Sequence, residues 1–278
     1  MTRLVTDSTS DLPDAVAAEL GITVVPLKVH FGSEEFRDRM DLDDQQFFEK
    51  LDGVTELPKT SQPSPGEFLE VYRNIPAGES IISVHLAEQL SGTYHSAQLA
   101  AQELPDRDIR VIDGGNVTAG LGLQVLAAAD MIKAGRSADE IETELRGLYD
   151  RTQLLAILDT LKYAIMGGRV SRLQGTIGGM LRLKALMLVD RGVIHRLPPA
   201  RTWSQAYQKI VEYIREKGGA ERIGILDALA PESRVALRAE LEKAFPDTPI
   251  FEAKLGAVIG THAGPGAVGC AFIARKAG

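Results

Sequence analysis

The sequence predicts an α/β protein of two domains, with a mainly parallel sheet carrying helices on both faces in residues 1–150 and an α+β domain in residues 151–278. In the first half, short apolar runs typical of strands alternate with helical segments, and strands separated by helical crossovers form parallel sheets. In the second half, the turn Asp190-Arg191-Gly192-Val193 joins two apolar runs, which is typical of a hairpin. Hairpins mixed with crossovers indicate an α+β domain.

Helix start and stop signals define the elements of the first half. Asp11 followed by Pro13 opens a helix that Gly21 ends, and Ser64 with Glu67 forms a capping box before another helix. The expected strands are residues 4–6, 22–31, 80–86 and 109–113, and the expected helices are residues 13–20, a segment beginning at 64, 91–104, 117–133 and 138–149.

Glycine pairs punctuate the second half. Gly167-Gly168 and Gly218-Gly219 end two expected helices, since glycine adopts the left-handed conformation that closes a helix. The expected helices are residues 159–166, 203–217 and 231–245, and the expected strands are 154–158, 186–189, 194–197, 222–226, 250–253 and a glycine-interrupted pair at 257–259 and 268–274.

Composition and charge exclude several classes of protein. A chain of 278 residues that is 44% hydrophobic and 25% charged is globular, with a sizeable core. The net charge of −7 argues against a nucleic-acid partner, which needs a basic face. The single Cys270 excludes an intramolecular disulfide, and no segment has the length of a transmembrane helix or the pattern of a signal peptide. We therefore expect a cytoplasmic protein.

Two clusters of hydroxyl groups stand at junctions between apolar runs. Ser91-Gly92-Thr93 follows a strand and opens a helix, where unpaired N–H groups and the helix dipole favour an anion and Gly92 lets a ligand approach the backbone. The simpler interpretation is that Ser91 only caps the helix. Thr60 and Ser61 form the second cluster, which by itself is consistent with a solvated turn. Both clusters together are expected to converge at the carboxyl ends of the strands, where open α/β sheets bind ligands.

The other candidates are two arginines, a histidine and an acid. Arg169 follows Gly167-Gly168 and Arg201 follows a proline turn, and guanidinium groups on loops suit carboxylate or phosphate recognition, although surface arginines at helix ends are common. His262 lies in a glycine-rich segment expected to be a loop, and a lone histidine is more often structural than catalytic. Asp7 is expected to tie down a turn. The sequence contains no metal-ligand spacing and no catalytic signature motif.

Short motifs recur from one end of the chain to the other, and each alone is weak. They are Val5-Thr6-Asp7-Ser8, Lys59-Thr60-Ser61-Gln62-Pro63-Ser64, Leu90-Ser91-Gly92-Thr93-Tyr94, Val111-Ile112-Asp113, Gly120-Leu121-Gly122, Leu158-Asp159-Thr160-Leu161, Gly167-Gly168-Arg169, and Gly260-Thr261-His262 with Gly264-Pro265-Gly266. In this order they resemble the DegV family of bacterial fatty-acid-binding proteins.

The resemblance implies a DegV-like two-domain fold that binds a long-chain fatty acid, such as palmitate or oleate, between its domains, with no other cofactor and no catalysis of its own. A separate fatty acid kinase, with a dihydroxyacetone-kinase-like ATP domain, would phosphorylate the carboxylate, and membrane contact would be transient. On that analogy the hydroxyls of Thr60 and Ser91 contact the carboxylate. Further residues assigned by the resemblance are Ser61, Gly92 and Thr93 as neighbours, and Arg169, Arg201 and His262 near the head group and the kinase-facing surface.

The chain also departs from the family pattern. Gly114-Gly115 replaces a usual serine, Lys184-Ala185 replaces Lys-Pro, and the segment 163–166 lacks a common basic residue.

Burying about 14 methylenes of a palmitoyl tail, at roughly 0.8 kcal/mol each, offers about 11 kcal/mol. The apolar runs Met180-Leu181 and 186–189 are candidates to line the tail tunnel, or alternatively belong to the core.

Two other functions remain open from the sequence. The first is an enzyme, a phosphotransferase or small-ester hydrolase that uses Ser91 and His262. The second is a regulatory module that senses a small carboxylate in a short pocket. An enzyme would turn over substrate without a partner, and the mass of the bound ligand would separate the regulatory module from a lipid carrier.

Overall fold

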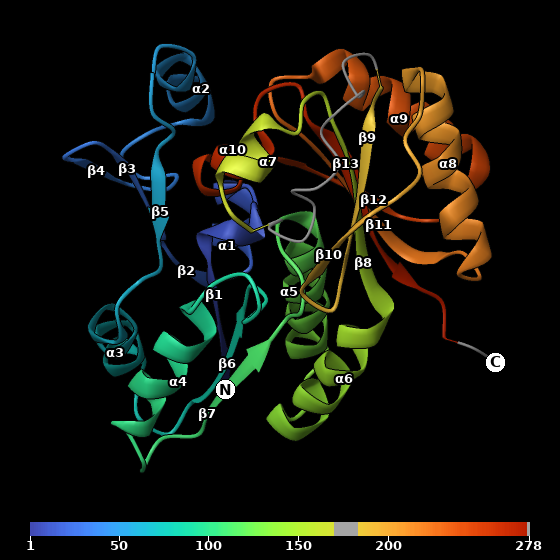
Figure 1. Ribbon diagram of the computed structural model, residues 1–278. Helices are drawn as coiled ribbons and strands as arrows, with labels where there is room; N and C mark the ends of the chain where they lie inside the picture. The colour runs from blue at the N-terminus through green and yellow to red at the C-terminus, as the bar shows by residue number, and fades with distance from the viewer. Residues whose placement is uncertain (170–182, 277–278) are drawn as a thin grey trace.

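The computed structural model describes residues 1–169 and 183–276, and a parallel sheet of four strands lies in its N-terminal part (Figure 1). The strands lie in the order β2 (Ile22–Val25), β1 (Thr2–Asp7), β6 (Ser80–His85) and β7 (Ile109–Asp113). Helices α3 (Pro65–Asn74) and α4 (Thr93–Gln102) cover one face, and α5 (Ala119–Lys133) and α6 (Ala138–Arg151) cover the other. The predicted α/β class, with helices on both faces of this sheet, is confirmed.

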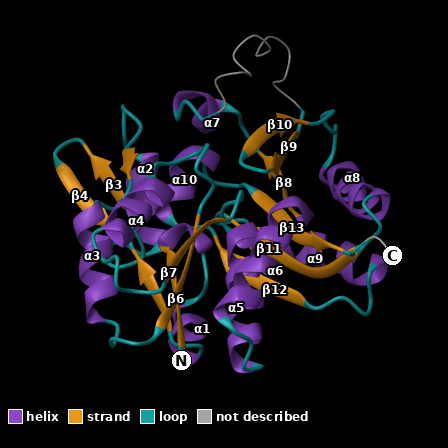
Figure 2. Ribbon diagram, turned by 90° about the horizontal axis from the view of Figure 1, so that it is seen from below, coloured by secondary structure: helices purple, strands orange, loops and turns teal. Residues whose placement is uncertain are grey.

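A second sheet has six strands and is mostly antiparallel. Its order is β10 (Val193–Arg196), β9 (Ala185–Asp190), β8 (Thr152–Leu158), β13 (Val268–Ala274), β11 (Ala220–Asp227) and β12 (Ile250–Lys254). Only β11 and β12 are parallel neighbours, and β9 and β10 form the predicted hairpin. Helices α8 (Trp203–Glu216) and α9 (Pro231–Ala244) pack on the face that points away from the N-terminal part (Figure 2). This arrangement of strands and helices is the α+β pattern that the second half of the sequence predicts.

Helix α5 lies between the two sheets and contacts strands of both. It is buried along most of its length because its residues are apolar or small on nearly every side, which is the pattern of a core helix. Small residues bring the backbones close together. Gly224 of β11 lies against the side chain of Ala119, and Gly122 lies against the backbone of Ser10. One continuous apolar cluster consequently runs from the first sheet through α5 into the second.

A third sheet was not predicted as such. It consists of β4 (Glu34–Arg37), β3 (Lys28–Phe31) and β5 (Lys59–Ser61), and helix α2 (Asp44–Asp52) connects β4 to β5. The expected single β-rich stretch at 22–31 is two strands belonging to different sheets, and the hydroxyl cluster at 59–61 is a strand where a solvated turn was the simpler expectation. Asp43 and Gln46 form a capping box that marks the start of α2. Short helical segments η1 (Ser8–Ser10), α1 (Asp14–Glu19) and α7 (Lys162–Met166) complete the connections.

The prediction of a strand at residues 257–259 was wrong. These residues begin helix α10 (Ala257–Ala263), so His262 lies on a helix and not in a loop. A short apolar run does not distinguish a strand from a buried helix by its periodicity, and here acceptors from distant segments satisfy the first N–H groups of the helix. Residues 268–274 form the expected strand.

The expected division near residue 150 remains a prediction. The strands of the parallel sheet come from residues 2–113 and those of the six-stranded sheet from residues 152–274. Met180-Leu181, one of the expected tunnel segments, lies outside the described residues. Among the residues that the structure describes, no helix combines the length and apolar character needed to span a bilayer.

We predict that Gly122→Ala in α5 lowers the free energy of unfolding by about 1–3 kcal/mol, because strain in a packed core costs about that much. An added Cβ would lie 2.7 Å from the backbone oxygen of Ser10, which has no freedom to rotate away. Urea denaturation measures the change. Gly147→Ala in α6 is the matched control, since nothing lies within 4 Å of its added Cβ, and it should stabilise the protein by up to about 1 kcal/mol. Equal effects of the two substitutions would contradict the tight packing of α5.

Candidate functional site

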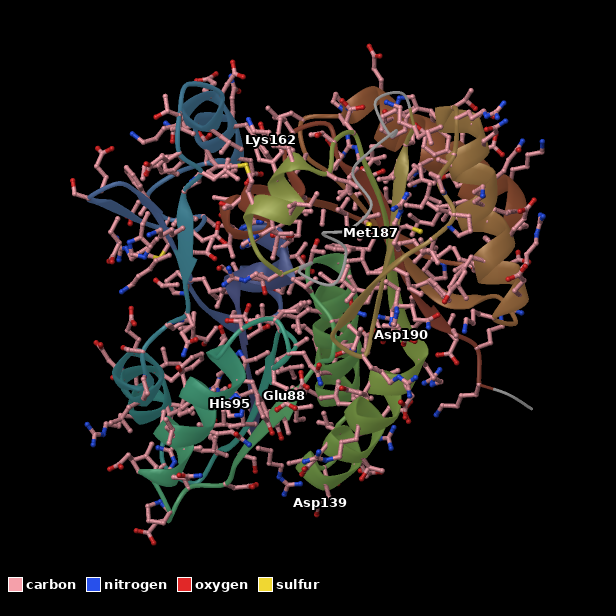
Figure 3. All side chains as sticks on the ribbon, viewed as in Figure 1. Glu88, His95, Asp139, Lys162, Met187 and Asp190 are labelled. Atoms are coloured by element: carbon pink, nitrogen blue, oxygen red, sulfur yellow. The ribbon has the colours of Figure 1, made fainter. Side chains whose placement is uncertain are left out.

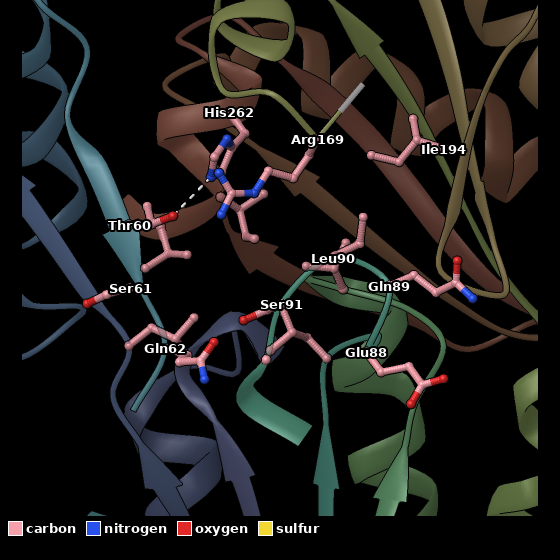
Figure 4. A pocket seen from close by; sticks show the side chains of 16 residues that line it. Thr60, Ser61, Gln62, Glu88, Gln89, Leu90, Ser91, Arg169, Ile194 and His262 are labelled. Carbon is pink, nitrogen blue, oxygen red and sulfur yellow. Dashed lines mark hydrogen bonds between the residues drawn. The ribbon is translucent and has the colours of Figure 1, made fainter. Parts of the chain in front are cut away.

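A cavity of about 640 Å³ lies between β5, the loop after β6 and helix α10 (Figure 4). This volume falls in the range of about 300–1,000 Å³ that small-molecule sites occupy. Its polar lining comes from segments far apart in the sequence and includes Thr60, Gln62, Ser91, Arg169 and His262. Leu27, Leu86, Leu90, Val258 and Ile259 supply apolar lining that the sequence analysis did not single out.

An apolar cavity of about 110 Å³ adjoins the polar one. The two cavities share Val117, Ile194, Ile259, Arg169 and His262 in their linings. The floor of the apolar cavity is the inner face of β8 and β9, where alternate residues point toward it. These residues are Leu154, Ala156, Leu158, Met187 and Val189.

The expected tunnel segment 186–189 divides between the two faces of β9. Met187 and Val189 line the apolar cavity, and Met187 lies in the interior of the molecule in Figure 3. Leu186 and Leu188 point to the other face and pack with α8 and α9. Two residues of this run therefore line the apolar cavity and the other two belong to the core, because side chains alternate between the two faces of a strand.

Thr60 and His262 meet at the centre of the polar cavity. The Thr60 Oγ1 and His262 Nε2 atoms are 3.2 Å apart, which joins β5 to α10 across 202 residues of sequence. Gly167 lies directly behind the imidazole, where a Cβ would be 2.2 Å from Nδ1. The Nδ1 atom is buried and has no hydrogen-bond partner among the described residues. The ring is thus held in place by packing on one side and by Thr60 on the other.

The imidazole of His262 is neutral at pH 7. Burial is the main cause that lowers its pKa to about 4, and the adjacent Arg169 guanidinium adds to the effect. Arg169 itself is exposed and donates from Nη1 to the carbonyl oxygen of Gly167 at 2.9 Å. A neutral imidazole donates one hydrogen bond and accepts another. It therefore suits a chain of hydrogen bonds that ends at an anion.

Ser91 lies one residue before the cap of α4. Gly92 is the N-cap, and the Ser91 hydroxyl accepts a hydrogen bond from the backbone N–H of Thr93 at 3.3 Å and pairs with the Thr93 hydroxyl at 2.9 Å. Ser91 and Gly92 line the cavity, so the positive end of a ten-residue helix faces it. The Thr93 side chain is fully buried behind them and does not line the cavity.

Ser61 lines the polar cavity but its hydroxyl is hydrogen-bonded to another side chain, and Arg201 lies outside the cavity. The Ser61 hydroxyl pairs with Nε2 of His30 at 2.8 Å, on the side of β5 away from Thr60 (Figure 4). Arg201 is exposed before α8, lines neither cavity, and its backbone N–H donates to Gln205. The structure thus brings together Thr60, Ser61, Ser91, Gly92, Arg169 and His262, and leaves Thr93 and Arg201 outside the cavity.

Gln62 is a cavity residue that the sequence analysis missed as a candidate. Its side chain lies over Gly92, where a Cβ would be 2.3 Å from Oε1, and its Nε2 donates to the Ser96 hydroxyl at 3.0 Å. Glycine at position 92 is therefore needed for this contact. The alternation of side chains along β5 was the available signal, since Thr60 and Gln62 point to the same side.

Ser91 and His262, the nucleophile and base that a hydrolase would need, are not hydrogen-bonded to each other in the described structure. In the described part of the chain, Ser91 is bonded to Thr93 and His262 to Thr60. A Ser–His–Asp chain does exist elsewhere, where His85 pairs with Ser83 at 2.7 Å and with Asp7 at 3.0 Å. All three side chains are fully buried, so no substrate reaches them. Asp7 also accepts from the backbone N–H of Thr9, as expected of a residue that ties down a turn.

No metal site is evident in the residues that the structure describes, where no group of three or more histidine, cysteine, aspartate or glutamate side chains is placed to hold an ion. The two cavities are lined by hydroxyl groups, amide side chains, a neutral imidazole, the N-terminus of α4 and an apolar floor, with the charged Arg169 and Glu88 also in the lining. Such a set is chemically suited to an amphipathic anion.

Comparison with known proteins agrees with this geometry. A family model described as "Uncharacterised protein, DegV family" matches residues 1–275. The chain belongs to the DegV family. A DegV domain-containing protein of Deinococcus radiodurans is 38% identical over 275 residues, which cover 97% of each chain. A solved structure described as fatty acid binding of a DegV family protein from Thermus thermophilus has 33% identity and a TM-score of 0.90, and the match covers 99% of both chains.

A more distant DegV-like structure shares the fold. It is the Streptococcus pneumoniae Fatty Acid Kinase (Fak) B3 protein loaded with linoleic acid, with a TM-score of 0.88 at 24% identity, covering 99% of this chain and 100% of that one.

The departures from the DegV pattern have local explanations. Gly115 has a φ of +58°, and a Cβ there would lie 2.4 Å from the ring of Tyr149. Gly114 leaves room for Gln124, whose Nε2 donates to the Gly114 carbonyl at 2.8 Å. Lys184 pairs with Asp159 at 2.5 Å. Gly114 and Gly115 line neither cavity.

In this DegV family member we predict that Gly92→Ala displaces Gln62 and lowers the free energy of unfolding by about 0.5–1.5 kcal/mol, the usual value of one hydrogen bond. The clash involves only the end of a flexible side chain. Gln62→Ala removes that side chain, so the double variant should be no less stable than Gln62→Ala alone. Urea denaturation of the three variants forms the cycle, and strictly additive losses would contradict the contact.

We predict a pH-dependent stability that His262 causes. The unfolded chain binds this proton near pH 6.5 and the folded chain only near pH 4, so stability present above pH 6.5 is lost as the pH falls toward 4. Between pH 7 and pH 5 the wild-type protein should lose about 2 kcal/mol more than His262→Gln. Burial raises the pKa of Asp11 and Asp38, which acts in the opposite direction, but both proteins contain these acids and the difference cancels them. Equal pH dependence of the two proteins would contradict a buried neutral imidazole.

Proposed function

We propose that this protein binds a long-chain fatty acid between its two large sheets and presents the carboxylate to a separate ATP-dependent kinase. The observation that carries the proposal is a polar cavity that continues into an apolar one, with His262 and Ile259 in both linings. The carboxylate would lie at Thr60, Ser91 and His262, next to the N-terminus of α4. The acyl tail would extend over β8 and β9 toward Met187.

The energetics assign different tasks to the two parts of the site. Burial of a palmitoyl tail contributes about 0.8 kcal/mol per methylene, whereas a carboxylate at a helix N-terminus gains only about 0.3–1 kcal/mol. The apolar wall therefore sets affinity, and the hydroxyl groups set the orientation of the head group. Binding of fatty acid by the Thermus thermophilus relative, at 33% identity, supports the lipid assignment.

A partner kinase would need access to the bound carboxylate. Arg169 is exposed at the edge of the polar cavity and Arg201 is exposed before α8, so both are accessible to a partner that must approach the carboxylate. The pneumococcal neighbour that carries the fatty acid kinase name shares the fold, and this likeness extends to the fold alone. A carrier of this kind needs no catalytic group of its own, and Ser91 and His262 are hydrogen-bonded to Thr93 and Thr60 and not to each other.

The first experiment is native mass spectrometry of the purified protein, followed by extraction and identification of the lipid. One equivalent of a long-chain fatty acid such as palmitate or oleate is expected. A protein that is empty and also takes up neither acid would contradict the proposal. A short bound carboxylate would point to a sensor module.

We predict that Ser91→Ala weakens fatty-acid binding by about ten-fold or more, because hydrogen bonds to charged groups contribute about 1.5–3 kcal/mol. Ser64→Ala is the matched control, since Ser64 caps α3 and lies outside the cavity.

Ala156→Leu should weaken palmitate binding by at least about ten-fold by filling the tail cavity with three further carbons. Competition with a fluorescent fatty acid measures all three variants, and unchanged binding by Ser91→Ala would contradict the head-group assignment.

A further inference from the structure

Helix α10 carries no side-chain cap of its own. Its N-cap is Gly256, and the two backbone N–H groups at its start donate to carboxylates from the other end of the chain. The N–H of Gly256 donates to Oδ1 of Asp11 at 3.0 Å, and the N–H of Ala257 donates to Oδ1 of Asp38 at 3.0 Å. These contacts span 245 and 219 residues. Acidic groups at a helix N-terminus satisfy free donors and complement the dipole.

The two carboxylates are unusual in their burial. Asp11 is 1% exposed and Asp38 is 2% exposed, and the second oxygen of each has no hydrogen-bond partner among the described residues. The Arg39 guanidinium lies 3.7 Å from Asp11 and also contacts the exposed Asp14, and Asp11 and Asp38 act on each other as like charges. Burial raises the pKa of Asp11 to about 8 and that of Asp38 to about 6. Burying two acids whose second oxygens have no partner costs free energy, which the bonds to α10 offset only in part.

The backbone in this region is strained as well. Asp11 and Arg39 have φ values of 51° and 64°, in the left-handed region that residues other than glycine rarely adopt. Strain of this kind persists where the surrounding structure fixes it and is frequent at functional sites. Backbone strain and buried acidic side chains thus coincide at the start of α10.

One segment of the chain holds α10 at its start, its middle and its end. Asp38, which follows β4, accepts a hydrogen bond from the first turn of α10. Helix α2 packs on the middle of α10, where a Cβ at Gly260 would lie 2.7 Å from Phe47. Thr60 of β5 pairs with His262 near its end. The third sheet and α2 therefore form a cradle, residues 28–61, and Asp38 and Thr60 are fixed to each other through β3 and its neighbours.

We propose that Asp11 and Asp38 are positioning residues that set the location of His262 in the polar cavity. They hold the first turn of α10, and a helix of seven residues transmits a shift at its start to His262 in its last turn. The consequence for a bound ligand rests on the proposed fatty-acid function. The consequence for the imidazole does not depend on that function.

The test compares Asp38→Ala with Asp38→Asn. NMR of isotope-labelled histidine gives the pKa of His262, and stopped-flow fluorescence gives the release rate of cis-parinaric acid. In Asp38→Ala the His262 pKa should rise from about 4 by about one unit or more toward 6.5, and release should accelerate by about ten-fold. Asp38→Asn retains an acceptor oxygen and should lie closer to the wild type in both measurements.

Ser137→Ala is the matched control. It removes the cap of α6, where the Ser137 hydroxyl accepts a hydrogen bond from the backbone N–H of Glu140 at 3.3 Å. Ser137 does not line the cavity, so the substitution should leave the His262 pKa unchanged. A folded Asp38→Ala with the wild-type His262 pKa would overturn the proposal. A wild-type protein that does not retain cis-parinaric acid would count against the proposed function, while the His262 titration would still decide the role of Asp38.

If Asp38→Ala does not fold, Ala257→Pro replaces it. Proline at the first position of a helix removes the donor to Asp38 and is otherwise well accommodated there. Gly256 already has the extended conformation, with φ −71° and ψ 172°, that the residue before proline prefers. The same rise in the His262 pKa is expected, and an unchanged pKa in folded Ala257→Pro would overturn the proposal.

Discussion

Helix α5 contacts the parallel sheet on one side and the six-stranded sheet on the other, and the rest of the molecule is arranged around this packing. Because Gly122 of α5 and Gly224 of β11 carry no side chain, η1 and β11 approach the helix closely. The two sheets are joined tightly along its length, and the cavities lie at its N-terminal end, beside Val117. A binding site at this place follows from two sheets that share one helix and separate where the helix begins.

The closure of the site comes from elements that belong to neither large sheet. The cradle of residues 28–61 reaches across to α10, which lies between two strands of the six-stranded sheet in sequence. The contacts include Gly260 against Phe47, the buried Asp38 at the start of α10 and the Thr60–His262 hydrogen bond, so the fit tolerates little change. The polar half of the cavity is consequently built from contacts distant in sequence, whereas the apolar half is the ordinary inner face of a sheet.

This difference explains what the sequence predicted well and what it did not. The alternation of strands and helices in residues 64–151 follows local periodicity and capping boxes, and it was predicted nearly to the residue at Ser64. Helix α10 was predicted as a strand because its caps come from Asp11 and Asp38, which no local pattern links to Gly256. The family motifs predicted Thr60, Ser91 and His262 as site residues. The motifs did not predict the hydrogen-bond partners of these residues. Ser61 lines the cavity beside Thr60, but its hydroxyl pairs with His30, a partner that the motif did not indicate.

The Thr60–His262 contact also has a consequence for the order of events during synthesis. The two residues are 202 positions apart, and a ribosome that adds about 5–20 residues per second needs roughly 10–40 s to pass from one to the other. During that interval β6 and β7 are added and the parallel sheet can form, while Asp11 and Asp38 have no donors from α10. The polar cavity, whose lining includes His262, can therefore form only after α10 has been made.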